Sequence, residues 1–209
     1  MTRLGIIPAG GQALRFGGTL KEMLPCKENT LLDRAVMAMN TGYADDVVVI
    51  TTPEKIGLHA AQLKNRNVWY RLALGSLWAS LEDVMRIEYD QYMFAMPDTY
   101  FPGDCFDDDH EGDFRLGVFK TNTPSRFGVV HEGVIWDKYF DAGEYEAWGV
   151  VLWSSKVADF WAENSSKIRT HTDAFNLAMD EFGFELFNLD YYYDMASFDD
   201  YRKLVKDVI

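Results

Sequence analysis

Residues 4–15 read LGIIPAGGQALR, an apolar run that passes directly into a glycine-rich loop and ends on an arginine. Strands that are buried on both faces read as continuous apolar runs, and residues 4–7 are of this kind. Similar runs alternate with helix-like segments through the first half of the chain, which indicates a parallel sheet covered by helices on both faces. We expect strands at residues 4–7, 47–50, 68–72 and 92–96, and helices at residues 31–39, 53–63 and 77–85. The sequence therefore predicts an α/β fold with a mostly parallel central sheet.

The composition excludes several classes of protein. The 209 residues carry 33 acidic and 20 basic side chains, a formal net charge of −13, so most of the surface repels a polyanion and nucleic acid is not expected as a partner. No apolar stretch approaches the roughly 20 residues that span a bilayer, and the N-terminus lacks the pattern of a signal peptide. Two cysteines and four scattered histidines form neither a disulfide framework nor a metal cluster. We expect a globular, cytoplasmic protein with no membrane partner.

The pattern changes near Phe114, where shorter candidate strands begin. They cover residues 115–120, 128–131, 134–136 and 150–153, and candidate helices cover residues 155–163, 172–182 and 198–208. No linker or repeat separates the two halves. We therefore expect a single domain over residues 1–209, with the second half laid on the same sheet.

The loop after the first strand is a candidate anion site, because ligands of parallel α/β sheets bind beyond the carboxyl ends of the strands. Gly10 and Gly11 allow backbone N–H groups to approach a phosphate, and Arg15 and Lys21 add positive charge. The loop is neither a P-loop nor a GxGxxG motif. A plain glycine-rich turn with two solvated cations is the alternative interpretation.

An Ala-Gly-Gly turn, an arginine and a Lys-x-x-Leu-Pro segment, in this order, resemble the N-terminal signature of the sugar-1-phosphate thymidylyl- and uridylyltransferases and their compact relatives. The resemblance implies a Rossmann-like nucleotidyltransferase fold in which the loop wraps a triphosphate. The arginine would neutralise the β- and γ-phosphates, and the lysine would lie near the α-phosphate. The matching positions are Ala9, Gly10, Gly11 and Gln12 for nucleotide binding, and Arg15 and Lys21 for catalysis. The usual third glycine of the family is Ala13 here.

Two aspartates are candidate magnesium ligands. Asp98 follows the fourth expected strand, and Asp194 precedes the last expected helix. Mg²⁺ prefers one or two carboxylates together with substrate phosphates, and the resemblance implies that Asp98, also a catalytic residue, and Asp194 hold it. The alternative interpretation, from the residues alone, is structural. In it Asp98 hydrogen-bonds within its own turn, and Ser197 is the N-cap of the last helix. The acidic run 107–109 is interpreted as a solvated loop and not as a glycosyltransferase metal motif.

The nucleoside and sugar sites follow from the same resemblance. Gly75 and Ser76 begin the helix after the third strand, where family members read the base, although a simple helix N-cap is the alternative. Tyr70 occupies the position of a base-reading glutamine. The candidates for sugar-phosphate binding are Arg126, Asp137, Lys138 and Gly149.

Segment 124–130, PSRFGVV, carries the resemblance for Arg126, because a similar stretch opens the sugar-binding half of the family. Trp148 replaces a threonine that lines the family's sugar pocket, which suggests a differently shaped pocket here. Packing of Trp148 in the core is the alternative.

Together these patterns predict an Mg²⁺-dependent nucleotidyltransferase that joins an NTP or dNTP to a sugar 1-phosphate and releases pyrophosphate. dTTP or UTP is favoured, with CTP as the alternative. Residues 1–110 would form the nucleotide-binding half, and residues 111–209 the sugar-binding half with its closing helix. A cytidylyltransferase for a non-sugar alcohol phosphate and an inactive nucleotide-binding regulator are the competing hypotheses. Whether the chain forms a homo-oligomer is left open, and the aromatic run 191–193 is a candidate either for packing within the chain or for an interface.

Overall fold

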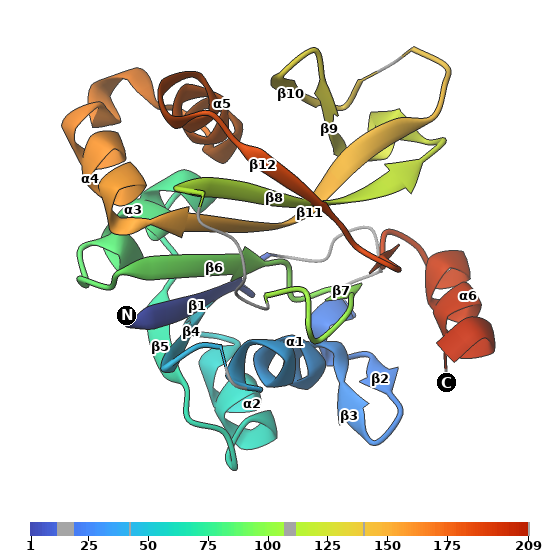
Figure 1. Cartoon of the computed structure of the whole chain (residues 1–209). Helices are drawn as coiled ribbons and strands as arrows, with labels where there is room; N and C mark the ends of the chain where they lie inside the picture. The colour runs from blue at the N-terminus through green and yellow to red at the C-terminus, as the bar shows by residue number, and fades with distance from the viewer. Residues whose placement is uncertain (12–18, 42, 107–111, 140, 209) are drawn as a thin grey trace.

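The computed structural model describes residues 1–11, 19–41, 43–106, 112–139 and 141–208. Within these residues, a single sheet of nine strands forms the centre of the molecule (Figure 1). The first half of the chain contributes four parallel strands in the spatial order β6-β1-β4-β5. They are β1 (Arg3–Pro8), β4 (Asp46–Thr51), β5 (Trp69–Leu72) and β6 (Gln91–Ala95). The predicted α/β class with its mostly parallel central sheet is confirmed.

The long strand β11 (Tyr145–Ser154) joins the two halves of the sheet. One of its edges pairs antiparallel with β6, and the other pairs antiparallel with β8 (Phe114–Thr121). The hairpin of β9 (Gly128–His131) and β10 (Val134–Asp137) extends from the β6 side of β11, while β12 (Glu185–Asn188) pairs parallel with β8. The second half of the chain thus continues the same sheet, largely with antiparallel pairing.

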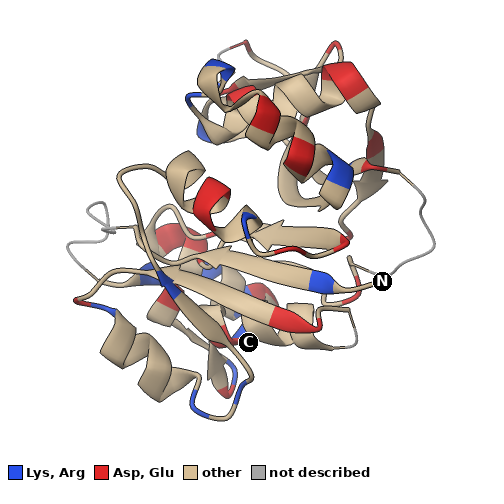
Figure 2. Cartoon of the chain, turned by 90° about the vertical axis from the view of Figure 1, so that its left-hand side faces the viewer, with Lys and Arg blue, Asp and Glu red and all other residues tan. Residues whose placement is uncertain are grey.

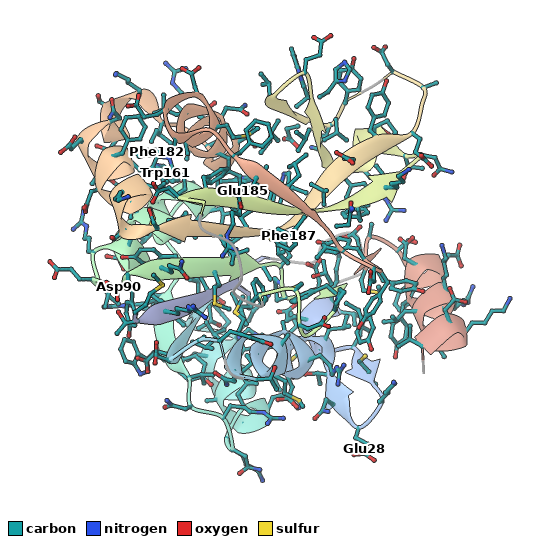
Figure 3. The ribbon with its side chains drawn as sticks, viewed as in Figure 1. Glu28, Asp90, Trp161, Phe182, Glu185 and Phe187 are labelled. Carbon is teal, nitrogen blue, oxygen red and sulfur yellow. The ribbon has the colours of Figure 1, made fainter. Side chains whose placement is uncertain are left out.

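Helices cover both faces of the sheet because successive side chains of each strand point to opposite sides. Leu4 and Ile6 of β1 face a core shared with α3, α4 and α5, whereas Ile7 faces a core shared with α1. Figure 3 shows Trp161, which is 1% exposed, on α4 in the first of these cores. The helices are α1 (Leu31–Asn40), α2 (Ile56–Gln62), α3 (Leu77–Met85), α4 (Ser155–Glu163), α5 (His171–Phe182) and α6 (Phe198–Val208).

The C-terminal segment crosses back to the N-terminal half before α6 begins. Its short strand β13 (Tyr193–Asp194) pairs antiparallel with β7 (Thr99–Tyr100), which lies just after β6. Met195 and Leu204 are fully buried in a third core with Leu24 and Leu31. Through Leu204, α6 therefore packs against the segment that precedes and begins α1. In Figure 1, α6 lies at the opposite end of the molecule from α4.

Acidic and basic positions are interspersed along the chain. On the side drawn in Figure 2, Asp and Glu positions occupy many helices and loops, with Lys and Arg positions dispersed among them. Among the described helices, we find none with the length and apolar character that crossing a membrane requires.

Candidate active site

The ends of β1 and β6 form a small cavity of about 160 Å³. This position is expected, because ligands of parallel sheets bind beyond the carboxyl ends of the strands. The cavity brings together predicted residues from two distant parts of the sequence, the loop after β1 and the turn after β6. Its lining consists of Pro8, Ala9, Gly11, Lys21, Glu22, Met96, Pro97 and Asp98.

Lys21 and Asp98 form an ion pair in this cavity. The Nζ atom of Lys21 donates to Oδ2 of Asp98 at 3.2 Å, and the two side chains are only 15% and 19% exposed. Lys21 belongs to the 3₁₀ turn η2 (Lys21–Met23), while Asp98 follows Pro97 directly after β6. A cation and a carboxylate that were predicted for the same reaction therefore face each other at one place.

Asp194 reaches the same place through the β13–β7 pairing. It lies opposite Thr99 in that ladder, and the next residue, Met195, donates its N–H to the carbonyl oxygen of Asp98 at 3.1 Å. Burial and the negative charge of Asp98 raise the pKa of Asp194, against the lowering effect of Arg126 and Lys21. Two carboxylates that repel each other in a partly buried site suit a divalent cation, which takes carboxylate oxygens together with phosphate oxygens.

Arg126 forms an ion pair with Asp194 and with a second aspartate. Its guanidinium donates to Asp194 at 2.9 Å and bidentately to Asp200 at 3.1 Å for each contact. The hydroxyl of Ser197 donates to Asp200 at 2.7 Å and accepts from the Asp200 N–H, so Ser197 also caps α6 as expected. Burial lowers the pKa of Arg126, but Asp200 and Asp194 outweigh it and raise the pKa above its ordinary value.

A polar cavity of about 310 Å³ opens beside Arg126. It contains basic, acidic, amide and aromatic side chains, so it offers a ligand both charged and hydrogen-bonding groups. Its lining consists of Phe119, Lys120, Thr121, Asn122, Thr123, Arg126, Phe127, Glu144, Tyr192, Tyr193, Asp194, Asp200 and Lys203.

A third cavity, of about 300 Å³ and mainly apolar, adjoins the Lys21–Asp98 cavity and shares Pro8, Gly11 and Met96 with it. Gly10, Gly75 and Ser76, three of the residues predicted for the nucleotide site, also line it. The other lining residues are Ile50, Ala73, Leu74, Leu77 and Ser80.

Ser76 has a structural role in the third cavity as well. Its hydroxyl accepts from the N–H of Ala79 at 3.1 Å and so caps α3. The two interpretations of Ser76, helix cap and cavity lining, therefore hold together. Gly10 lies close to the residue that follows β5, since a Cβ on Gly10 would lie 2.8 Å from Cβ of Ala73.

The remaining sugar-site candidates lie less close to this centre. Asp137 ends β10, and both it and Lys138 are exposed. Lys138 has a positive φ of 57° and donates its N–H to Phe127, next to Arg126. The loop residues predicted for phosphate, Gln12 and Arg15, lie outside the described residues, as does the acidic run 107–109.

Gly149 and Trp148 lie in β11 and pack against neighbouring rings. A Cβ on Gly149 would lie 2.6 Å from a ring carbon of Tyr192, so the glycine makes room for that ring. Trp148 contacts Phe175 with a centroid distance of 5.6 Å and belongs to the edge of the first core. Core packing, the alternative interpretation for Trp148, therefore describes its contacts.

Lys55 and Glu22 are residues near the site that the sequence did not single out. Both are buried, and both contact the cavity region: Glu22 lines it, and Lys55 donates to backbone carbonyls of Ala9 and Gly11. A lone lysine after a strand and a glutamate beside Lys21 look like ordinary solvated charges. Only the fold brings them together.

Comparison with known proteins agrees with this architecture. Residues 5–106 match the family model of the MobA-like NTP transferase domain. The sequence has no significant match among curated proteins. A putative glucose-1-phosphate thymidylyltransferase from Bacillus anthracis, solved with sucrose, superimposes with a TM-score of 0.84 at 19% identity, over 97% of this chain and 94% of that one.

Two solved cytidylyltransferases are also similar. The inositol-1-phosphate CTP transferase of T. maritima has a TM-score of 0.77 at 16% identity, over 99% of this chain and 96% of that one. The CTP:phosphocholine cytidylyltransferase of Streptococcus pneumoniae has a TM-score of 0.74 at 18% identity, over 99% of each chain. The resemblance inferred from the sequence motifs is confirmed. Residues 5–106 match the model of the MobA-like NTP transferase domain, and the whole chain has the same fold as these solved nucleotidyltransferases.

Proposed function

We propose that this protein is a nucleotidyltransferase that joins an NTP or dNTP to a sugar 1-phosphate and releases pyrophosphate. The observation that carries the proposal is the meeting of Asp98, Asp194 and Lys21 at the carboxyl end of the parallel strands. The mainly apolar cavity beside Gly10 on one side and the polar cavity beside Arg126 on the other suit a nucleoside and a phosphorylated acceptor.

In this reaction an oxygen of the acceptor phosphate forms a bond to the α-phosphorus of the nucleotide, and the bond from that phosphorus to pyrophosphate breaks. Catalysis of this kind rests on positioning and on neutralising phosphate charge. Lys21 would turn from Asp98 to the α-phosphate, and Arg126 would orient the acceptor phosphate. Arg15 keeps its predicted role of holding the departing pyrophosphate. Lys138 is a second predicted contact for the acceptor phosphate.

Asp98 and Asp194 are the residues that would hold Mg²⁺, whose charge offsets that of the reacting phosphates. The fit rests on their donor chemistry, because hard carboxylate oxygens are what Mg²⁺ prefers. Among the described residues no group of three or more Asp, Glu, His or Cys side chains converges as a metal site. Two carboxylates leave coordination positions for phosphate and water, as expected for a metal that binds with its substrate.

A non-sugar acceptor is the second candidate function. The similar structures include enzymes described as acting on inositol 1-phosphate and on phosphocholine, both with CTP. The polar cavity beside Arg126 mixes acids, bases and aromatic rings, and such a lining also suits an alcohol phosphate.

The experiment is a measurement of pyrophosphate release for dTTP, UTP, CTP, ATP and GTP, each paired with glucose 1-phosphate, other sugar 1-phosphates, inositol 1-phosphate and phosphocholine. Release with a sugar 1-phosphate supports the proposal, and release only with an alcohol phosphate supports the second candidate. Nucleotide binding by calorimetry without release for any acceptor would favour an inactive regulator.

The metal assignment is tested by Asp98→Asn and Asp194→Asn in the active pair of substrates. Each substitution is expected to lower kcat by at least about 100-fold, the scale of removing one electrostatic contact from a transition state. Asp199→Asn is the matched control, since Asp199 lies on α6 with its side chain 86% exposed. Near wild-type activity in either of the first two variants would refute the assignment.

A further inference from the structure

A buried ion pair lies next to two segments of the candidate site, the loop after β1 and the turn η2. Nζ of Lys55 lies 2.8 Å from Oε1 of Glu22, and the residues are 8% and 4% exposed. Glu22 belongs to η2, the 3₁₀ turn that also contains Lys21, and Lys55 is the residue that precedes α2. A charge pair this deep requires its remaining hydrogen-bonding groups to be satisfied, because desolvation of the two ions is costly.

Lys55 uses its three donors on three acceptors. In addition to Glu22, its ammonium donates to the carbonyl oxygen of Ala9 at 3.2 Å and to the carbonyl oxygen of Gly11. These two carbonyls belong to the loop after β1, which forms part of both the 160 Å³ and the 300 Å³ cavities. One side chain from the start of α2 therefore holds both the loop and the turn that carries Lys21.

Glu22 is supported from its other side by a buried histidine. Nε2 of His59 lies 3.4 Å from the Glu22 carboxylate, and Nδ1 of His59 is 2.9 Å from the hydroxyl of Thr51 at the end of β4. A ring with its proton on Nε2 accepts from the Thr51 hydroxyl at Nδ1 and turns its N–H side toward the Glu22 carboxylate. Burial raises the pKa of Glu22, but His59 and Lys55 outweigh burial and hold it below its ordinary value.

These contacts fix the direction of peptide groups in the loop. The carbonyl of Ala9 and the N–H of Gly10 belong to one planar trans peptide, so they point in opposite directions. Because the carbonyl is held toward Lys55, the Gly10 N–H is turned away from it. The N–H of Ala9 is separately bonded to the carbonyl of Ile50 in β4 at 2.7 Å. The backbone at the entrance of the nucleotide cavity is thus held from both sides.

We infer that Lys55, balanced by Glu22, is a positioning residue that presents the backbone of Ala9–Gly11 and the side chain of Lys21 to a nucleoside triphosphate. The inference rests on the proposed function. It assigns the ion pair to orientation of the nucleotide site and not to general stability, since a buried ion pair gives little net stability over apolar side chains of similar volume.

The test separates positioning from stability with a double variant. Lys55→Met alone leaves Glu22 buried without its partner and is expected to lower Tm. Lys55→Met/Glu22→Gln removes both charges, so Tm is expected to recover, while the loop carbonyls remain unheld. Nucleotide binding is measured by calorimetric titration with dTTP, UTP and CTP in turn. For the nucleotide that binds best, the Kd of the double variant should be about tenfold above that of the wild type, the scale of losing a hydrogen bond.

The matched control is the double variant Arg66→Met/Asp33→Asn. Arg66 and Asp33 form another partly buried ion pair, with Nε and Oδ1 2.7 Å apart, but it lies on α1 and after α2, outside the contacts to the loop. Its nucleotide Kd should match that of the wild type. Steady-state kinetics should show a raised KM for the nucleotide and an unchanged KM for the acceptor in Lys55→Met/Glu22→Gln. A Kd within twofold of wild type in that variant would overturn the inference.

A measurement without nucleotide keeps the two proposals distinguishable. Hydrogen exchange of the Ala9 amide should be faster in Lys55→Met/Glu22→Gln than in the wild type, relative to amides within β4 as an internal reference. If the wild type releases no pyrophosphate with any of the five nucleotides of the activity panel, the proposed function fails, while exchange still reports on the loop. Unchanged exchange at Ala9 would overturn the positioning role whichever nucleotide binds.

Discussion

The guanidinium of Arg126 donates to the carboxylate of Asp194 at 2.9 Å across 68 residues of sequence. The same side chain pairs with Asp200 in the first turn of α6, so Arg126 connects β13 and the polar cavity to this helix. An arginine in this position can exchange a carboxylate for a phosphate, because both present oxygen pairs to its planar fork. Arg126 therefore lines the polar cavity and also contacts Asp194, one of the two candidate metal ligands.

Arg126→Gln is expected to raise the KM for the phosphorylated acceptor roughly 10- to 100-fold, the scale of losing a charge-assisted hydrogen bond. The Kd for the nucleotide should change little, because Arg126 lines neither the cavity beside Gly10 nor the Lys21–Asp98 cavity. Steady-state kinetics with each substrate varied separately measures both effects. Arg202→Gln serves as the control, since that arginine is 80% exposed on α6. An unchanged acceptor KM would remove Arg126 from the acceptor site.

Gly10→Ala is expected to weaken nucleotide binding, because its Cβ would meet Cβ of Ala73 at 2.8 Å, closer than real Cβ contacts. Ala73→Gly removes the opposing methyl, so the double variant Gly10→Ala/Ala73→Gly should regain most of the affinity. Nucleotide Kd values for the wild type, both single variants and the double variant form a thermodynamic cycle. If the double variant binds no better than Gly10→Ala, the loop needs a glycine for a reason other than space.

Gly149→Ala is expected to lower the free energy of unfolding by about 1–3 kcal/mol, the usual cost of overpacking a core. The added methyl would press on Tyr192, which stacks on Phe119 at 4.2 Å and lies two residues before Asp194. Chemical denaturation measures the loss, and kcat should fall as well.

Gly57→Ala is the paired control for Gly149→Ala, because Gly57 lies in α2 with open space around it. A helical Gly→Ala change is expected to stabilise by up to about 1 kcal/mol. Destabilisation of equal size at both positions would show that glycine itself, and not the contact with Tyr192, is what matters.

Thr170→Ala is expected to cost about 1 kcal/mol of stability, because Thr170 and Asp173 form a capping box at the start of α5. Burial raises the pKa of Asp173, but the N–H groups of Thr170 and Arg169 outweigh it and hold the pKa below 3.8. A lowered carboxyl pKa adds stability above the ordinary value, and that stability is lost as pH falls through the folded-state pKa.

The pH dependence of this box is measured by Tm of the wild type and Asp173→Asn between pH 7 and pH 2. The difference in Tm should be largest at neutral pH and shrink below about pH 3.8. A difference that stays constant over the whole range would mean that the charge of Asp173 does not contribute.

Much of this arrangement could be predicted from the sequence, because the strands of the first half are long apolar runs with a clear pattern. The loop after β1 and the turn at Asp98 were placed at strand ends for that reason, and they line one cavity. Asp194 was found by resemblance alone. The ladder that brings it to Asp98 consists of two-residue strands, which have no periodicity to detect.

The buried network could not be predicted, because Lys55, Glu22 and His59 are isolated polar residues with ordinary neighbours in the sequence. Their burial depends on α2 and η2 meeting beneath the loop, which is a tertiary effect. The antiparallel position of β11 between β6 and β8 is also a property of topology, since its apolar run fits either direction of pairing.

The pairing of β6 with β11 has a consequence for folding of the chain during its synthesis on the ribosome. The strands β1, β4, β5 and β6 are synthesised first and can assemble among themselves, but one edge of β6 keeps unpaired backbone groups until β11 emerges. At about 5–20 residues per second, that edge stays open for several seconds. An open strand edge can pair with another chain, so β6 is a site where the nascent N-terminal half is exposed to aggregation.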